Sequence, residues 1–175
     1  MAKQLKPKPT GLVFLKLLTS DIVVPTLTNP FIVRDNFKED VSDEAVVKIS
    51  HLGYTGYNFQ KWFLNQTIKS RAGYSLTSYK LGHTSLGQPI LDGLGGVNKV
   101  KTDLAAVSYL MSLQPQGQKG ILLIDGRVNM FYCIDVNGIL RAVYVYWYGG
   151  GWGVDTYSVE GLDPWGGGSR VFSRL

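Results

Sequence analysis

The feature that most limits the folds open to this chain is an alternation of two residue classes near its end, over residues 142–174. Between Val143 and Tyr148, apolar residues occupy the odd positions and tyrosines occupy the even ones. Successive side chains of a β-strand point to opposite faces, so the segment predicts a strand with one buried face and one tyrosine face. After a turn expected at Gly149-Gly150-Gly151 the alternation resumes, and a tight hairpin would place both polar rows on one side of a two-stranded ribbon.

The two residue classes are expected to have opposite environments. The apolar framework should be buried; it comprises Val143, Val145, Trp147, Trp152, Val154, Val159, Trp165, Val171 and Phe172. The second set contains only Tyr, Gly, Asp and Ser, and it comprises Tyr144, Tyr146, Tyr148, Gly153, Asp155, Tyr157, Gly161, Asp163, Gly166 and Ser169. Tyr gives a large, rigid contact at low entropic cost, and small residues fill around it, so this composition is typical of a binding face. We therefore predict that the second set binds a ligand and that its hairpin members share one exposed surface.

A simpler interpretation is that Tyr merely favours a half-buried strand. The same four residue types continue through Gly161, Asp163 and Ser169, where a loop is expected. Strand propensity does not explain that continuation, which favours the binding interpretation.

The end of the chain carries a Trp, two residues, a Gly, one residue and then Val-Phe-Ser-Arg, at Trp165, Gly168 and Val171–Arg174. This ending resembles the variable region of target-binding proteins diversified by diversity-generating retroelements, in particular a group found in candidate-phyla bacteria. In that group the template carries mainly Asn at mutable positions, and adenine-directed mutation yields codons for Tyr, Asp, Ser and Gly. The resemblance assigns the second set to those positions and adds Gly149 and Gly167. Thr156, Leu162 and Pro164 depart from the group's pattern.

The resemblance implies a C-type-lectin-like fold, which is α+β, and a final strand at Arg170–Arg174 that ties the chain ends together. It covers about Phe31 to Arg174 and is most specific from Ile121 onward. It implies an unknown protein or cell-surface ligand as the partner and leaves the identity of that ligand open.

Local patterns predict the remaining elements and agree with an α+β class. Two helices are expected, one from Asn58 with Phe59, Trp62 and Phe63 on one face, and one from Thr102-Asp103 to Pro115. Strands are expected at Gly11–Leu18, Ile22–Val24, Phe31–Arg34, Ala45–Ile49, Ala72–Leu81, Ile121–Ile124, Asn129–Ile134 and Ile139–Tyr148.

Length and composition favour one domain. With 175 residues and 45% apolar content, we expect a flexible basic tail at residues 1–10 and one domain at residues 11–175, with a variable region at 142–175. A single cysteine, Cys133, excludes an intramolecular disulfide framework. No long apolar run or secretory signal is visible, so a membrane partner is not expected and a cytoplasmic location is the default.

Other functional classes have less support. The net charge is +5, but no Lys or Arg occurs between Arg141 and Arg170, which argues against a nucleic-acid face. His51 and His83 are the only histidines and form no HExxH motif, and no G-x-S-x-G elbow occurs, so neither a metal, a cofactor nor an enzyme is expected. A remote alternative is a hydrolase using Asp155 and Asp163.

A carbohydrate-binding lectin-like module is the closer alternative. In it, Tyr144, Tyr146 and Trp152 would stack on sugar rings, and Asp155 would accept hydrogen bonds from hydroxyls. Calcium is not expected, because the segment from Glu160 to Pro164 is a poor copy of a calcium-binding loop.

Overall fold

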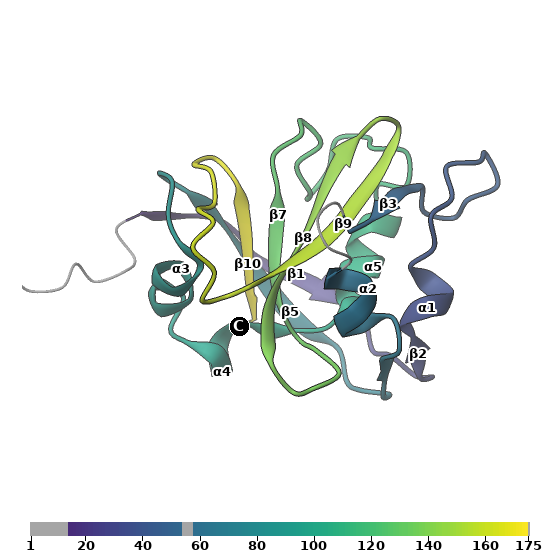
Figure 1. The fold of residues 1–175 in the computed structure, drawn as a ribbon, viewed down its shortest axis with the longest axis horizontal. Helices are drawn as coiled ribbons and strands as arrows, with labels where there is room; N and C mark the ends of the chain where they lie inside the picture. Colours follow the sequence, from purple (N-terminus) through teal and green to yellow (C-terminus); the bar gives the residue numbers. More distant parts are fainter. Residues whose placement is uncertain (1–13, 54–57, 175) are drawn as a thin grey trace, which may run out of the picture.

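The computed structural model describes residues 14–53 and 58–174, and a single large β-sheet organises them (Figure 1). The strands of this sheet lie in the order β1-β5-β10-β7-β8-β9-β3, and β6 also pairs with β7. Their bounds are β1 Leu15–Val24, β3 Ile49–Leu52, β5 Tyr74–Leu81, β6 Lys101–Thr102, β7 Asn129–Ile134, β8 Leu140–Tyr148, β9 Gly151–Ser158 and β10 Arg170–Arg174. A separate small ribbon joins β2 (Phe31–Ile32) to β4 (Thr67–Ile68).

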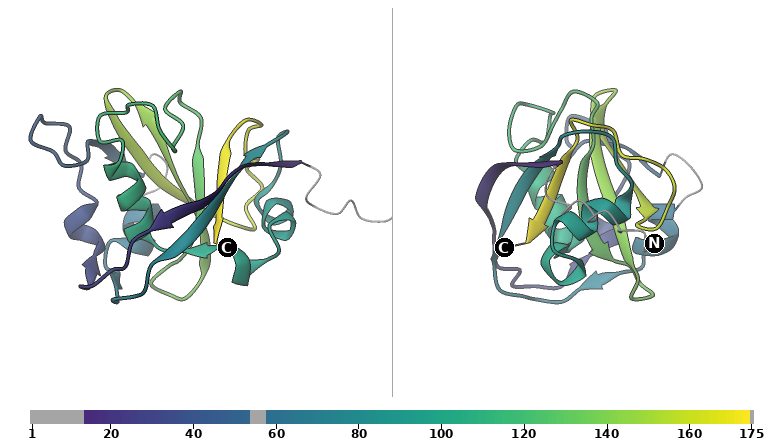
Figure 2. Two further views of the ribbon diagram at one scale, coloured as in Figure 1. Left: turned by 180° about the vertical axis from the view of Figure 1, so that it is seen from behind. Right: turned by 90° about the vertical axis from the view of Figure 1, so that its left-hand side faces the viewer.

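The helices fall into two groups on opposite sides of the molecule (Figure 1). Figures 1 and 2 show α3 (Gly87–Gly93) and α4 (Val97–Val100) on one side, and α1 (Val33–Asn36), α2 (Asn58–Phe63) and α5 (Leu104–Ser112) on the other. This mixture of sheet and helices confirms the α+β class.

The sheet is packed on both faces. Alternate residues of β7 show this directly, because Phe131 and Cys133 belong to the hydrophobic cluster that includes α5, whereas Met130 and Tyr132 belong to a second cluster that includes α3. A sheet with helices or loops on both sides buries both sets of its side chains. The second cluster also includes Tyr144, with Tyr146 and Tyr157 packed against it, so it covers part of the predicted tyrosine face.

Several predicted elements are confirmed. The strand at Asn129–Ile134 has the predicted bounds, and the final strand exists at Arg170–Arg174. The helix predicted after Thr102-Asp103 is α5; Asp103 is its N-cap and accepts a 2.9 Å hydrogen bond from the Ala106 N–H.

Three strand predictions were wrong in their bounds or type. The segment predicted at Phe31–Arg34 is extended for two residues only and then turns into α1 at Val33, and the strand predicted at Ala45–Ile49 begins only at Ile49. No strand forms at Ile121–Ile124. There the Leu122 N–H donates to Gln114 Oε1 at 2.7 Å and the Leu123 N–H to Asn129 Oδ1 at 2.7 Å, so side chains replace a neighbouring strand as acceptors.

The two ends of the described chain are joined through β5. Strand β10 pairs antiparallel with β5 and parallel with β7, and β5 lies between β10 and β1. Of the strands predicted at Gly11–Leu18 and Ile22–Val24, residues 11–13 lie outside the described residues, and Leu15–Val24 form one strand, β1, in which a register shift coincides with Asp21 at φ 60°. The tail predicted at residues 1–10 lies outside the described residues. Within the described ranges, none of the helices is long and apolar enough to cross a bilayer.

Candidate functional site

The hairpin β8–β9 has the register that the alternation predicts. Tyr144 lies opposite Asp155 and Tyr146 lies opposite Gly153, so both polar rows are on one face of the ribbon. The turn consists of Gly149 and Gly150 at φ 64° and 86°, a conformation that suits a two-residue hairpin loop. Gly151, expected in the turn, instead begins β9.

The hairpin members of the apolar framework pack on the other face, in the cluster that includes α5, whereas Val159, Trp165 and Val171 belong to the second cluster. Val143, Val145, Trp152 and Val154 are completely buried, as predicted. The indole N–H of Trp152 donates to the Gln114 carbonyl at 3.2 Å, which satisfies its only polar atom. The prediction that Trp147 is buried was wrong, because this side chain is only partly buried. Its ring packs edge-on against Trp152, at 5.3 Å between centroids.

The tyrosine face is not the open surface that the sequence predicted. Tyr144 is 7% exposed and Asp155 is 0% exposed, and Gly153 and Ser169 are also buried. The reason is the loop after β9, in which Trp165 exchanges backbone hydrogen bonds with Ser85 at 2.7 and 3.0 Å. This places the Trp165 ring edge-on against Tyr144, 5.3 Å away between centroids, so the chain itself covers this part of the face.

We call His51, Tyr146, Tyr144, Tyr157 and Trp165 the aromatic row. Tyr144 stacks on Tyr146 at 6.0 Å and on Tyr157 at 5.3 Å, within the range of favourable ring pairs. His51 continues the row from β3: its ring contacts Tyr146 at 5.3 Å and its Nε2 is hydrogen-bonded to the Tyr146 hydroxyl. Each ring of the row therefore contacts at least one other ring, so these side chains form one connected support.

Burial keeps the centre of the row uncharged. It raises the pKa of Tyr144 far above that of a free phenol, and contact with Tyr157 and the charge on Asp155 act in the same direction. The Tyr144 hydroxyl therefore donates to Asp155 Oδ2 at 3.4 Å, and Asp155 Oδ1 accepts from the Thr156 N–H at 2.8 Å. An Asp155 carboxylate held in this way and shielded from solvent is poorly placed to act on a substrate.

The exposed part of the second set lies around the row. Tyr148 is 69% exposed at the hairpin tip, and Asp163 and Gly166 are exposed in the loop after β9. Tyr146, Tyr157 and Gly161 are half-buried between them. We call these six residues the combining rim: Tyr146, Tyr148, Tyr157, Gly161, Asp163 and Gly166.

Sequence reasoning missed the part played by His51. Strand β3 pairs in parallel with β9 and sets His51 opposite Gly153. A Cβ atom at Gly153 would lie 2.5 Å from His51 Cε1 and 2.6 Å from Tyr146 Cζ, so glycine is what lets both rings close over the strand. His51 and Tyr146 are 95 positions apart, and no local signal in the sequence joins them.

No cluster of three or more metal-ligating side chains occurs in the part of the chain that the structure describes. Comparison with known proteins finds no matching family model, curated protein or solved structure.

Proposed function

We propose that this is a non-enzymatic ligand-binding protein that binds a protein or cell-surface target through its combining rim, and that its C-terminal region is diversified by adenine-directed mutagenesis. The observation that carries the proposal is the division within one short segment. Val143, Val145 and Val154 are completely buried, whereas Tyr148 and Asp163 face solvent. Variation at the solvent-facing positions leaves the core intact, which is what a diversified receptor needs.

Four of the ten positions take a different role in this proposal. Tyr144, Gly153, Asp155 and Ser169 are buried, so they shape the support beneath the rim instead of contacting the ligand. A substitution at one of them would alter binding by moving the aromatic row.

The extent of the rim favours a large target. Tyr148 precedes β9 and the loop with Asp163 follows it, so the two ends of the rim are separated by the eight residues of that strand. At about 3.3 Å per residue a strand of this length extends about 25 Å, which leaves room for contacts with a target larger than a single sugar unit.

We propose a C-type-lectin-like arrangement for the fold. It is supported by the late antiparallel hairpin β8–β9, by the return of β10 to the centre of the sheet, and by the joining of the described chain ends through β5. This part of the proposal comes from the resemblance and is tested by an experimental structure compared with such domains.

A carbohydrate-binding module is the second candidate. The observation that favours it is the half-buried state of Tyr146 and Tyr157, because partly exposed rings suit stacking on a sugar. Trp152 cannot contribute to such a platform, because it is completely buried on the other face of the sheet.

Two experiments test the proposal. The first is the neighbouring DNA, where we expect a reverse-transcriptase gene and a near-copy of the codons for residues 142–174 that differs only at adenines. Absence of that repeat would remove the diversification claim and leave the binding claim standing.

The second experiment compares binding partners. One protein captured from a lysate should be lost with Tyr148→Ser plus Asp163→Ser and retained with the control Lys69→Gln, an exposed residue that follows β4 of the separate small ribbon. If both variants capture the protein equally well, the combining rim is not the binding surface. Binding to a defined sugar on a glycan array would favour the lectin alternative.

A further inference from the structure

A groove of about 620 Å³ lies away from the combining rim. Its walls come from residues 24–47, from Arg71 and from α5, and no residue of the 142–174 segment lines it. Its volume is within the range of about 300–1,000 Å³ that is usual for small-molecule sites.

Small side chains on α5 create the hollow. Ala105, Ser108 and Ser112 repeat at intervals of three or four residues, so they lie on one side of the helix and face the groove. Phe31 and Tyr109 add aromatic rings to the same lining. The floor is therefore largely apolar and includes two rings able to contact a flat or cationic group.

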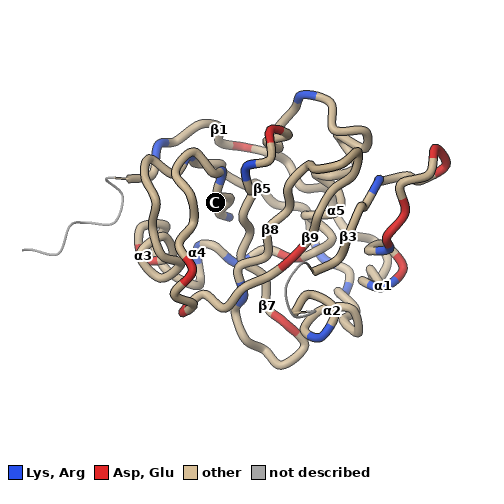
Figure 3. Tube along the Cα trace, turned by 45° about the horizontal axis from the view of Figure 1, so that its top comes forward, with Lys and Arg blue, Asp and Glu red and all other residues tan. Residues whose placement is uncertain are grey.

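The edge of the groove is acidic. Asp35, Asp40 and Glu44 line it, against Lys38. Figure 3 shows acidic residues gathered around α1 and the loop that leads to β3, although the chain as a whole carries a charge of +5. A hydrogen bond from the Ser42 N–H lowers the pKa of Asp40, so this carboxylate is ionised at neutral pH.

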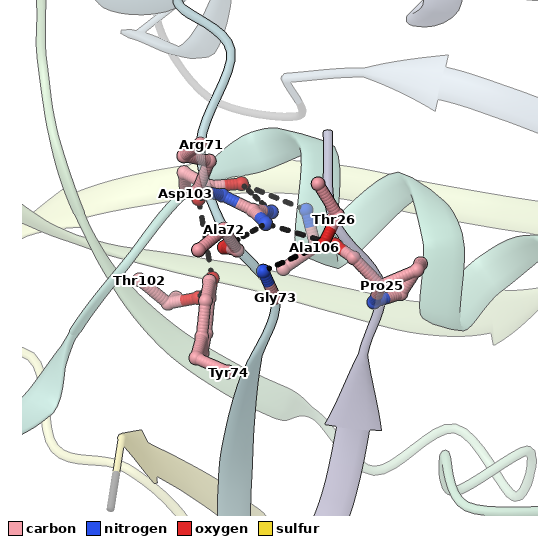
Figure 4. Close-up of polar contacts among 9 residues, drawn as sticks. All are labelled: Pro25, Thr26, Arg71, Ala72, Gly73, Tyr74, Thr102, Asp103 and Ala106. Carbon is pink, nitrogen blue, oxygen red and sulfur yellow. Dashed lines mark hydrogen bonds and ion pairs between the residues drawn. The ribbon is translucent and has the colours of Figure 1, made fainter. Parts of the chain in front are cut away.

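Arg71 also lines the groove, but its charge is already compensated. Its Nε and a terminal nitrogen donate to the two oxygens of Asp103 at 2.5 and 3.1 Å, and its other terminal nitrogen donates to the Pro25 carbonyl at 3.0 Å (Figure 4). This bidentate pair fixes Arg71 as part of the wall. Three carboxylates against Lys38 leave the edge net negative.

We propose that this groove binds an organic cation, an ammonium group attached to an apolar body. The carboxylates attract the ammonium group, while Phe31, Tyr109 and the small residues of α5 accept the apolar part. An anionic ligand of the same shape is repelled, and a neutral one lacks the charge contact. Because the fixed part of the chain builds this site, it is independent of the proposed diversified surface.

The test uses 2-phenylethylammonium as the probe, with 2-phenylethanol and 3-phenylpropionate as neutral and anionic analogues. Titration followed by amide NMR should move the signals of Ala105, Ser108 and Ser112. The ammonium compound should bind at least about tenfold more tightly than either analogue, and its affinity should fall with added salt. Equal affinity for the alcohol, or no binding of the amine, would overturn the proposal.

Variants separate the contribution of charge from that of shape. Asp35→Asn with Glu44→Gln should weaken binding of the amine about tenfold, while Asp92→Asn with Glu160→Gln, an equal change of charge outside the groove, should leave it unchanged. Ser108→Phe should fill the groove and abolish binding. If both groove variants still bind the amine, the groove is not its binding site. Thermal denaturation checks that each variant is folded. The rim variant Tyr148→Ser should bind the amine as tightly as the native chain. A negative result for the groove is therefore distinguishable from a negative result for the combining rim.

Discussion

Two tyrosines on one face of β8 provide a matched test of how the hairpin is built. Tyr144 is 7% exposed and Tyr148 is 69% exposed, although both occupy even positions of the same alternation. We expect Tyr144→Ser to destabilise the protein strongly and Tyr148→Ser to have almost no effect. The alternation alone makes the two positions equivalent, so the difference between the two losses in stability measures the contribution of tertiary packing.

The magnitude follows from what each ring contacts. Tyr144 packs against the rings of Tyr146, Tyr157 and Trp165 at 6.0, 5.3 and 5.3 Å, and its hydroxyl donates to Asp155. Truncating a large buried aromatic ring costs about 3–5 kcal/mol, so we expect a loss of about 4 kcal/mol in the free energy of unfolding. Exposed Tyr148 should cost less than about 0.5 kcal/mol.

Urea denaturation followed by tryptophan fluorescence measures both values. For a chain of this length, the loss at Tyr144 corresponds to a fall of about 10 °C in the melting temperature. Tyr144→Phe is the control, since it keeps the ring and removes only the hydroxyl with its bond to Asp155, at a cost of about 1 kcal/mol. A loss below about 1 kcal/mol for Tyr144→Ser, or equal losses at Tyr144 and Tyr148, would refute the packing of the aromatic row.

Three further predictions concern other parts of the fold. Asp103→Ala should lower the free energy of unfolding by about 3 kcal/mol, because α5 loses its cap and Arg71 its carboxylate; a loss below about 1 kcal/mol in urea denaturation would contradict this. Gly150→Ala should cost about 1 kcal/mol, because φ is 86° there, and a neutral result in the same assay would exclude this turn. Burial alone would raise the pKa of Asp135, but hydrogen bonds from backbone N–H groups and from Arg141 lower it below its usual value. Its stabilising effect is therefore present above the unfolded pKa of about 3.9 and is lost as pH falls through the folded pKa. Melting temperatures of the native chain and Asp135→Asn should converge below about pH 4, and parallel curves would argue against this role.

Elements set by local chemistry were predictable from the sequence. The alternation at Val143–Tyr148 predicts β8 and its two faces, because side-chain direction along a strand depends only on position. Asp103 marks the start of α5, since a capping carboxylate acts on backbone groups three residues away. The segment at Ile121–Ile124 misled prediction, because the side chains that satisfy its backbone, Gln114 and Asn129, lie outside the apolar run.

The alternation in the sequence is therefore enough to say which side chains share a face, but whether that face is open to solvent depends on contacts between distant segments. The period of a strand orders Tyr144, Tyr146 and Tyr148 on one side whatever surrounds them. Burial of that side depends on Trp165, held by its bridge to Ser85, and on His51, which β3 brings to Gly153. These contacts join segments far apart in the chain, and their energy comes from packing between surfaces that no local pattern describes.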